Sequence, residues 1–203
     1  MALPRYETLD TVRELVWERL EMAAQDPGHA FRTLTFGTVE ANAPALRTVV
    51  LRAASAEDRQ LQFHTDRRSG KVEALRDNPQ VAWHGWDPES AQQIRLSGTA
   101  TVHLHDEVAT ALWEHESPAS LDLYVCPPSP GTPIDEPDDR LPPAVQSDPI
   151  TDEDVADGWP YFAAIRTVVD EIEWLHLHPD GHYRAQFAYQ PNQEAFEGSW
   201  VVP

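Results

Sequence analysis

Three consecutive segments within residues 31–66 have the patterns of β-strands joined by connections of only a few residues. FRTLTFGTVE (31–40) alternates apolar and polar residues, LRTVVLRAA (46–54) is rich in β-branched residues, and RQLQFHTD (59–66) follows the polar link SAED. A parallel crossover needs about a dozen residues or more, so neighbouring strands here must run antiparallel. This constraint favours an antiparallel meander within a mainly β fold.

Further strand patterns continue along the chain. Strands are expected at 80–86, 92–105, 161–177, 183–190 and 196–203. Six or more antiparallel strands with few helices predict a closed or nearly closed β-barrel. We expect Gly98 to mark a β-bulge in the strand at 92–105, because an isolated glycine in a strand often does so.

A few helices complete the predicted fold. In TLDTVRELVWERLEMAA, apolar residues recur at helical spacing after the potential N-caps Thr8 and Asp10. In SGKVEALRDN, Ser69 is a good N-cap and an Asn-Pro pair stops the pattern. Helices are therefore expected at about 8–25, 69–78 and 106–116.

Length and composition limit the class of protein. The 203 residues suit one domain over 1–203, and 41% hydrophobic residues are enough for a core. Residues 127–159 are proline-rich and acidic, so we expect a surface excursion or a partly ordered loop. Cys126 is the only cysteine, which excludes an internal disulfide. With no long apolar run and no signal pattern, we expect a cytoplasmic protein that binds no membrane.

The charge distribution is uneven. The chain has a formal charge of -19, which disfavours binding to nucleic acid or to an anionic membrane. Residues 47–71 carry six basic and three acidic side chains, a local charge of +3. Such a basic island in an acidic chain suggests a small anionic ligand. For Arg59, Arg67 and Arg68 we expect solvated loop charges.

Three short motifs could contact such a ligand. Lys71 is the only lysine and follows Ser69 at a helix start, where free backbone N–H groups favour a phosphate. Arg47 and Arg52 lie on opposite faces of one strand, roughly 16 Å apart, and could serve two ends of an extended ligand. In QQIRLSG, glutamine and arginine donors on one strand face could bond to the carbonyls of a flat heterocycle. Each motif alone is also compatible with ordinary surface residues.

The order of these motifs carries more information than each alone. RTVVLR, F-H-T-D-x-x-S-x-K, NPQVAWHGW and QQIRLSG follow one another over about residues 46–100. This series resembles the pyridoxamine 5'-phosphate oxidase family and its FMN-binding split-barrel relatives. A weaker match covers 161–190, where EIEW is followed by an arginine ten residues after the tryptophan. The resemblance implies a split barrel of antiparallel strands, FMN as cofactor, and a homodimer with FMN at the subunit interface.

The resemblance also implies roles for individual residues. Arg47 and Lys71 match phosphate ligands, Gln93 matches the glutamine near the flavin ring, and Trp174 with Arg184 matches a pair from the last strands. The backbone of 49–51 would lie along the ring, and His64 and Thr65 would support the ribityl chain and phosphate. The implied cofactor-binding residues are Arg47, Thr48, Val49, Val50, Leu51, Arg52, His64, Thr65, Ser69, Lys71, Gln93, Trp174 and Arg184.

The chain also departs from the family pattern. Gly70 stands where the oxidases usually have another phosphate-binding arginine. Asp180 begins the triplet that matches an Arg-x-His motif contacting substrate in the vitamin oxidases, and an aspartate there would repel a substrate phosphate. The tyrosine, arginine and serine set of the oxidases is not recognisable. The cofactor motifs therefore match better than the substrate motifs, and His182 and Arg52 are the only candidates for catalysis.

Two functional classes follow from these patterns. The first is an FMN-dependent oxidoreductase that performs two-electron chemistry on an unidentified small substrate. The alternative is a non-catalytic flavin-binding carrier or sensor. A protein that has lost flavin and binds another anion fits less well, since Arg47 and Lys71 both persist. Two H-x-H pairs, at 103/105 and 176/178, have no evident third ligand, so we expect no metal site.

Overall fold

The computed structural model describes residues 5–138, 140–146 and 149–203. The chain divides into two compact units, each of which is described by itself. The first unit comprises Met1–Phe63, Asn78–Thr101 and Arg166–Pro203. The second comprises His64–Asp77 and Val102–Ile165.

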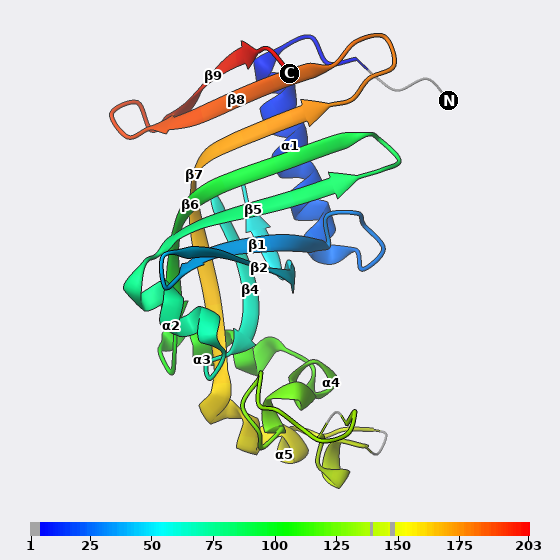
Figure 1. The fold of residues 1–203 in the computed structure, drawn as a ribbon, viewed down its shortest axis with the longest axis vertical. Coiled ribbons are helices and arrows are strands. Elements are labelled where there is room, and N and C mark those ends of the chain that lie inside the picture. The colour runs from blue at the N-terminus through cyan, green and yellow to red at the C-terminus, as the bar shows by residue number, and fades with distance from the viewer. Residues whose placement is uncertain (1–4, 139, 147–148) are drawn as a thin grey trace. The chain divides into compact units, whose positions relative to one another are not determined.

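Antiparallel β-structure dominates the described chain, as the strand patterns predict (Figure 1). The order of strands in the sheet is β2-β1-β5-β6-β7-β4-β3, and β8 joins β7 to β9. The pairs β1–β2, β1–β5, β3–β4, β5–β6, β7–β8 and β8–β9 are all antiparallel. The strands are β1 (Thr33–Glu40), β2 (Ala43–Val50), β3 (Ala53–Ser55), β4 (Gln60–Asp66), β5 (Gln80–Asp87), β6 (Gln92–His103), β7 (Phe162–His176), β8 (Tyr183–Gln190) and β9 (Ala195–Val201).

The segment predicted as one strand at 46–54 is divided into two. The N–H of Leu51 donates to the carbonyl of Arg32, whereas the N–H of Arg52 donates to that of Gln62, both at 2.8 Å. As a result β2 pairs with β1, and β3 pairs with β4. The prediction of antiparallel neighbours is confirmed, but the prediction of a single strand is wrong, because the backbone changes partner at this point.

The predicted bulge at Gly98 is absent from the pairing of β6 with β5. The register of β5 with β6 is unbroken from Gln80 opposite Thr99 to Asp87 opposite Gln92. A Cβ at Gly98 would lie only 2.0 Å from the carbonyl oxygen of Val168. Glycine is required there because the backbone of β7 passes too close for any side chain.

Helix α1 (Leu9–Gln25) confirms the predicted N-terminal helix. It lies across one face of the sheet of the first unit (Figure 1). The hydroxyl of Thr8 accepts a hydrogen bond from the N–H of Thr11 and so caps the helix. The apolar positions that recur at helical spacing are buried, as expected for a helix packed on one face: Val12, Val16, Trp17, Leu20 and Ala23.

Aromatic rings form the centre of the first unit. Phe36 lies edge-on to Phe63 and to Trp83, with ring centroids 4.8 and 4.9 Å apart. The indole N–H of Trp83 donates to the hydroxyl of Thr167 at 3.2 Å, which satisfies the one polar group that the ring buries. This core fixes the positions of β1, β4, β5 and β7 within the unit.

The second unit is mainly helical and has its own apolar cluster. Val145 and Val155 are 5% and 1% exposed and pack in this cluster beside Phe162. The segment 127–159, for which we expected a surface excursion or a partly ordered loop, thus contributes these two buried side chains to the cluster. The helices are α2 (Gly70–Asp77), α3 (Glu107–His115), α4 (Pro118–Leu121) and α5 (Asp152–Val155), with 3₁₀ turns at Asp122–Val125, Pro143–Gln146 and Ala156–Tyr161.

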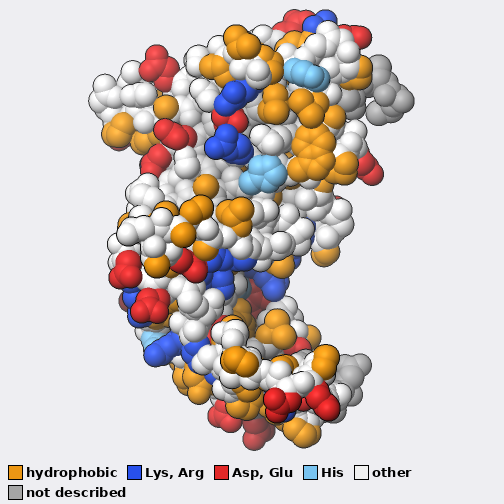
Figure 2. Space-filling view, viewed as in Figure 1, with side chains coloured by type: hydrophobic (Ala, Val, Ile, Leu, Met, Phe, Trp, Pro, Cys, Tyr) orange, Lys and Arg blue, Asp and Glu red, His pale blue; other side chains and the backbone are white. Residues whose placement is uncertain are grey.

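The surface reflects the acidic composition. Figure 2 shows acidic side chains scattered over the visible face rather than gathered in one continuous patch. No helix in the described part of the chain has the length and apolar character needed to cross a membrane.

Candidate functional site

In the second unit, the turn from β4 into α2 gathers three polar side chains. The ammonium of Lys71 donates to the hydroxyl of Thr65 at 2.8 Å and to that of Ser69 at 2.6 Å. The helix begins directly after Ser69, whose carbonyl accepts the first-turn bond from the N–H of Val72. A Cβ at Gly70 would meet no atom within 4 Å, so the space beside the helix start is open. We call Thr65, Ser69 and Lys71 the phosphate cradle.

The phosphate cradle opens into a pocket of about 440 Å³, the cradle pocket. His64 and Arg68 also belong to its lining, and much of the remaining lining comes from residues after α4, among them Tyr124 and Pro128. The volume is at the lower end of what small-molecule sites occupy. All of the lining residues belong to the second unit.

The histidine of this pocket has a defined position. His64 has a side chain only 5% exposed, and its Nδ1 lies 3.3 Å from a carboxylate oxygen of Glu116. Its ring also meets Phe162 edge-on, with centroids 5.0 Å apart. Glu116 follows α3 directly and fixes the orientation of the ring, and no sequence pattern indicated this partner.

Arg68 is not the solvated loop charge that we expected. Its guanidinium binds the carboxylate of Asp66, with Nη2 2.6 Å from Oδ2, and its side chain is 14% exposed. The hydrogen bond with Asp66 raises the pKa of Arg68, so the charge is permanent. The same side chain donates to the carbonyls of Cys126 and Pro127 and stacks over the ring of Tyr161.

Arg59 likewise has protein partners and is not simply solvated. Its guanidinium donates to the carbonyl of Val169 at 2.8 Å and lies 3.3 Å from the ring centroid of Tyr189. The predicted basic island is thus divided: Arg47, Arg52 and Arg59 belong to the first unit, whereas Arg67, Arg68 and Lys71 belong to the second.

In the first unit, Arg47 is held by neighbours on β1. Its Nη1 donates to the hydroxyl of Thr38 at 2.6 Å, and its Nη2 pairs with the carboxylate of Glu40. Glu40 therefore competes with any anionic ligand for this guanidinium. Strand alternation places Val49 and Leu51 in the core and leaves Val50 40% exposed.

Strand β2 is the terminal strand of the sheet order in the described chain. One of its edges pairs with β1, so alternate N–H and C=O groups point away from the sheet on the other edge. These groups include backbone positions among Thr48, Val49 and Val50. An edge of this kind can supply hydrogen bonds to the polar rim of a flat ring.

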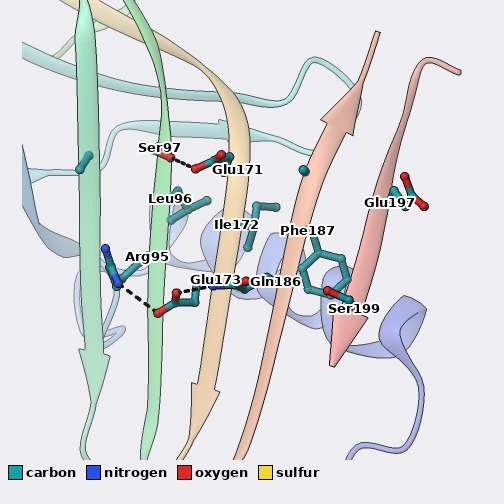
Figure 3. A pocket seen from close by; sticks show the side chains of 12 residues that line it. Arg95, Leu96, Ser97, Glu171, Ile172, Glu173, Gln186, Phe187, Glu197 and Ser199 are labelled. Carbon is teal, nitrogen blue, oxygen red and sulfur yellow. Dashed lines mark hydrogen bonds and ion pairs between the residues drawn. The ribbon is translucent and has the colours of Figure 1, made fainter. Parts of the chain in front are cut away.

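A second pocket of about 300 Å³ lies on one face of the sheet, across β6, β7, β8 and β9, and we call it the sheet pocket (Figure 3). At its centre Glu173 accepts hydrogen bonds from Arg95 at 3.2 Å, Arg184 at 2.6 Å and Gln186 at 3.0 Å. Beside it, the carboxylate of Glu171 accepts from the hydroxyl of Ser97 at 2.9 Å.

The carboxyl of Glu173 stays ionised despite its position. Burial alone would raise its pKa, but the hydrogen bonds from Arg184 and Gln186 and the charge of Arg95 together lower the pKa below the ordinary value. Glu173 therefore offsets one of the two positive charges of Arg95 and Arg184 and reduces the attraction of this face for an anion. The sequence patterns did not single out Glu173, and strand alternation with Glu171 was the only available signal.

The side chains of Gln93 and Arg184 lie on the face of the sheet that carries the sheet pocket, whereas the side chain of Trp174 is in the core. The carboxamide oxygen of Gln93 is 3.3 Å from Nε2 of His84, on the strand face that also carries Arg95. Trp174 is fully buried, and its indole N–H donates to Gln92 at 3.2 Å. The structure therefore does not bring the side chains of Trp174 and Arg184 together, and their joint contact with a cofactor stays a prediction.

The two catalytic candidates lie in different surroundings. His182 is exposed in the connection between β7 and β8. Arg52 is half-buried where the chain passes from β2 to β3. Both belong to the first unit, and neither lines the cradle pocket.

Comparison with known proteins agrees with the motifs. Residues 14–104 match the family described as pyridoxamine 5'-phosphate oxidase, FMN-binding domain. A pyridoxamine 5'-phosphate oxidase-related, FMN binding protein from Nostoc punctiforme has a similar structure, with a TM-score of 0.73 and 25% identity over 97% of this chain and 100% of that one. Residues 14–104 therefore belong to the pyridoxamine 5'-phosphate oxidase-like FMN-binding domain family.

More distant relatives of this pyridoxamine 5'-phosphate oxidase-like protein share the fold alone. PhzG from Burkholderia lata, solved with tetrahydrophenazine-1-carboxylic acid, has a TM-score of 0.67 at 19% identity over 98% of this chain and 94% of that one. A protein related to general stress protein 26 from Clostridium acetobutylicum has a TM-score of 0.54 at 13% identity, covering 90% and 99%. A comparison with curated protein sequences gives no match.

The family assignment confirms the fold class predicted from sequence, a mainly β split barrel of antiparallel strands with a few helices. The matched region contains the whole 46–100 motif series and also most of α1. The pyridoxamine 5'-phosphate oxidase-like family consists of FMN-binding proteins, many of them oxidoreductases, and the roles of single residues are a separate question.

Proposed function

We propose that the protein binds FMN and acts as an oxidoreductase on a small substrate. The observation that carries this proposal is the phosphate cradle, because Lys71 and two hydroxyls converge at a helix start. A phosphate dianion is the ligand for which such a site is built: an ammonium supplies charge, hydroxyls supply hydrogen bonds, and free N–H groups of the first helical turn point at the ligand.

The donor set fits an FMN phosphate in chemical terms. Lys71 carries positive charge, Thr65 is 8% exposed, and Ser69 lies at the helix start, so much of the site is screened from solvent. Charged hydrogen bonds are stronger where water competes less. A neutral ligand such as riboflavin lacks the phosphate and would gain none of these interactions.

The family resemblance assigns a further set of residues to the flavin ring. The exposed edge of β2 provides backbone groups near Val49 and Val50, and Gln93 provides an amide that His84 orients. Amide and backbone N–H groups can bond to carbonyl oxygens of an isoalloxazine and stabilise negative charge that develops there. When bound, FMN supplies the two-electron chemistry itself, and the protein supplies binding, orientation and electrostatics.

A non-catalytic flavin carrier or sensor is the second candidate. Asp180 occupies the position where the vitamin oxidases bind substrate with arginine, and its side chain is 78% exposed in the structure. Such a residue provides no attraction for a substrate phosphate. This observation favours either a different substrate or no turnover at all, and pyridoxamine 5'-phosphate is the substrate that it disfavours most.

We also propose that two copies of the chain form a homodimer. Several apolar side chains on β2 and β5 are exposed, among them Leu46 at 71%, Val50 at 40% and Trp86 at 41%. Covering these groups would remove apolar surface from water, which is the main driving force of association. Light scattering on the purified protein tests the proposal, and a mass of one chain at micromolar concentration would contradict it.

The decisive experiment is a flavin titration of the purified protein. We expect FMN to bind with the loss of its free fluorescence, and riboflavin to bind at least about tenfold more weakly because it lacks the charged hydrogen bonds. Anaerobic addition of NAD(P)H then separates the two candidates, since bleaching of the bound flavin supports an oxidoreductase. Equal affinity for FMN and riboflavin would contradict the assignment of the phosphate cradle.

A further inference from the structure

In the segment 126–134, with the sequence CPPSPGTPI, six residues line the cradle pocket together with the phosphate cradle. We infer that this segment, the proline wall, closes the cofactor phosphate site from outside and that Arg68 holds it in place. The inference rests on the proposed binding of FMN and adds a positioning residue and a wall that the family motifs do not contain.

The contacts of Arg68 connect the two sides of the pocket. On one side Arg68 binds the carboxylate of Asp66, which directly follows Thr65 of the phosphate cradle in the chain. On the other side its Nη2 donates to the carbonyl of Cys126 at 2.9 Å and its Nη1 to that of Pro127 at 3.0 Å. Charged donors to backbone carbonyls are among the stronger hydrogen bonds of a protein.

Arg68 is thereby unsuited to bind phosphate itself. Its donors already bond to a carboxylate and two carbonyls, and its Cζ lies 3.8 Å from the ring centroid of Tyr161. A phosphate would have to displace several of these bonds. The role that remains is mechanical: Arg68 fixes the beginning of the proline wall beside the helix that carries Lys71.

The proline wall is rigid by its own sequence. It contains four prolines, whose rings fix φ and reduce the freedom of the unfolded segment. Within it, the N–H of Thr132 donates to the carbonyl of Ser129 at 3.1 Å, and Gly131 has a φ of 88°. Proline at the second position and a left-handed glycine at the third are the pattern of a type II turn.

A rigid wall in the cradle pocket acts mainly on the bound state. A ligand passes the wall both on entering and on leaving, so a steric barrier alone would slow both rates equally. The wall also excludes water from the charged hydrogen bonds between a bound phosphate and the phosphate cradle, which strengthens these bonds and lowers the dissociation rate. The association rate is governed mainly by diffusion and by charge, to which the wall contributes little. Loosening the wall should therefore raise the dissociation rate of FMN and leave the association rate almost unchanged.

Stopped-flow measurement of FMN association and dissociation tests this inference in the full-length protein. We expect Arg68→Ala to raise the dissociation rate about tenfold, the scale of a lost charged hydrogen bond, with an association rate within about twofold of wild type. Arg67→Ala is the matched control. It removes the same charge from the neighbouring position, where the side chain donates to the carbonyl of Pro160 instead.

A faster dissociation in Arg68→Ala could also result from misfolding of the variant or from direct binding of phosphate by Arg68. A second variant separates the inference from these two explanations. Gly131→Val leaves every charge in place but strains the turn, because a β-branched residue disfavours a φ of 88°. We expect it to raise the dissociation rate of FMN by at least about threefold, as a looser turn exposes the site. An unchanged rate in Gly131→Val, or equal rates in Arg68→Ala and Arg67→Ala, would overturn the inference. Wild-type protein that binds no FMN would overturn the proposed function as well.

Discussion

Lys71 reaches back across the turn that precedes its helix, so that its Nζ lies 2.8 Å from the hydroxyl of Thr65. The only lysine of the chain thereby connects the end of β4 with the first turn of α2. An ammonium placed between two hydroxyls can exchange one of these bonds for a bond to phosphate oxygen at little cost, because the hydroxyls are neutral acceptors.

Replacing this lysine should weaken the binding of FMN and leave riboflavin almost unaffected. For Lys71→Met we expect a loss of about 1.5–3 kcal/mol, or roughly ten- to a hundredfold in Kd, because a charged hydrogen bond is removed. Titration calorimetry measures both ligands. Arg76→Met is the control, since Arg76 is an exposed cation on the same helix. An equal loss in both variants would mean that only general charge matters.

Substitutions of Arg47 and of Glu40 should change the affinity for FMN in opposite directions. Arg47→Met should weaken FMN binding, because the family resemblance makes this guanidinium a phosphate ligand. Glu40→Gln should strengthen it severalfold, since the carboxylate that competes for Arg47 becomes neutral while its shape is kept. Fluorescence titration at low ionic strength measures both changes. Unchanged affinity in both variants would remove Arg47 from the site.

Gly98 should be among the most sensitive positions for stability. Gly98→Ala places a methyl group 2.0 Å from the carbonyl oxygen of Val168, and the backbone of β7 cannot move as a side chain can. We expect a loss of about 3 kcal/mol or more in the free energy of unfolding, measured with urea. Gly70→Ala is the control, because its new methyl group would meet no atom within 4 Å. Similar losses in both variants would contradict the close approach of β7.

Stability should fall when the pH drops below about 6.5, in part because of His176. Burial and the neighbouring His178 lower the pKa of His176, whose ordinary value is 6.5. The unfolded chain therefore takes up a proton first as the pH decreases, and the free energy of unfolding falls with it. His29, whose pKa is also lowered by burial, adds to the effect.

Urea unfolding at a series of pH values between 5 and 8 tests this prediction. His176→Leu should flatten the dependence, because the titrating group in the core is removed and the replacement is apolar. His182→Leu serves as the matched control at an exposed position. If both variants show the same dependence as the wild type, His176 does not contribute to acid sensitivity.

Strand alternation and helical spacing were sufficient to predict most elements of this fold. Leu51 and Arg52 show where such patterns stop being informative. Both residues keep the expected alternation, with Leu51 buried and Arg52 half-buried, and yet the chain changes partner strand between them. The strand to which a backbone N–H donates depends on residues far along the sequence. A local sequence pattern therefore cannot predict this partner.

The candidate site shows the same limit. The Ser69 and Lys71 motif indicates a phosphate site because a helix start and a lysine are local features. Arg68 looked like one more surface charge, since its partners at 126–127 and at Tyr161 lie far along the chain. The glycine at 98 likewise indicated a bulge, and only the position of Val168 reveals the close approach of β7 to this residue.

The change of partner between Leu51 and Arg52 makes two adjacent amides into separate reporters. One amide hydrogen is protected by Arg32 on the β1 side, and the next is protected by Gln62 on β4. Deuterium exchange at these neighbouring positions should therefore follow the opening of two different parts of the sheet. Equal exchange rates at the two amides would mean that the two parts of the sheet open together. Unequal rates would mean that one part opens before the other.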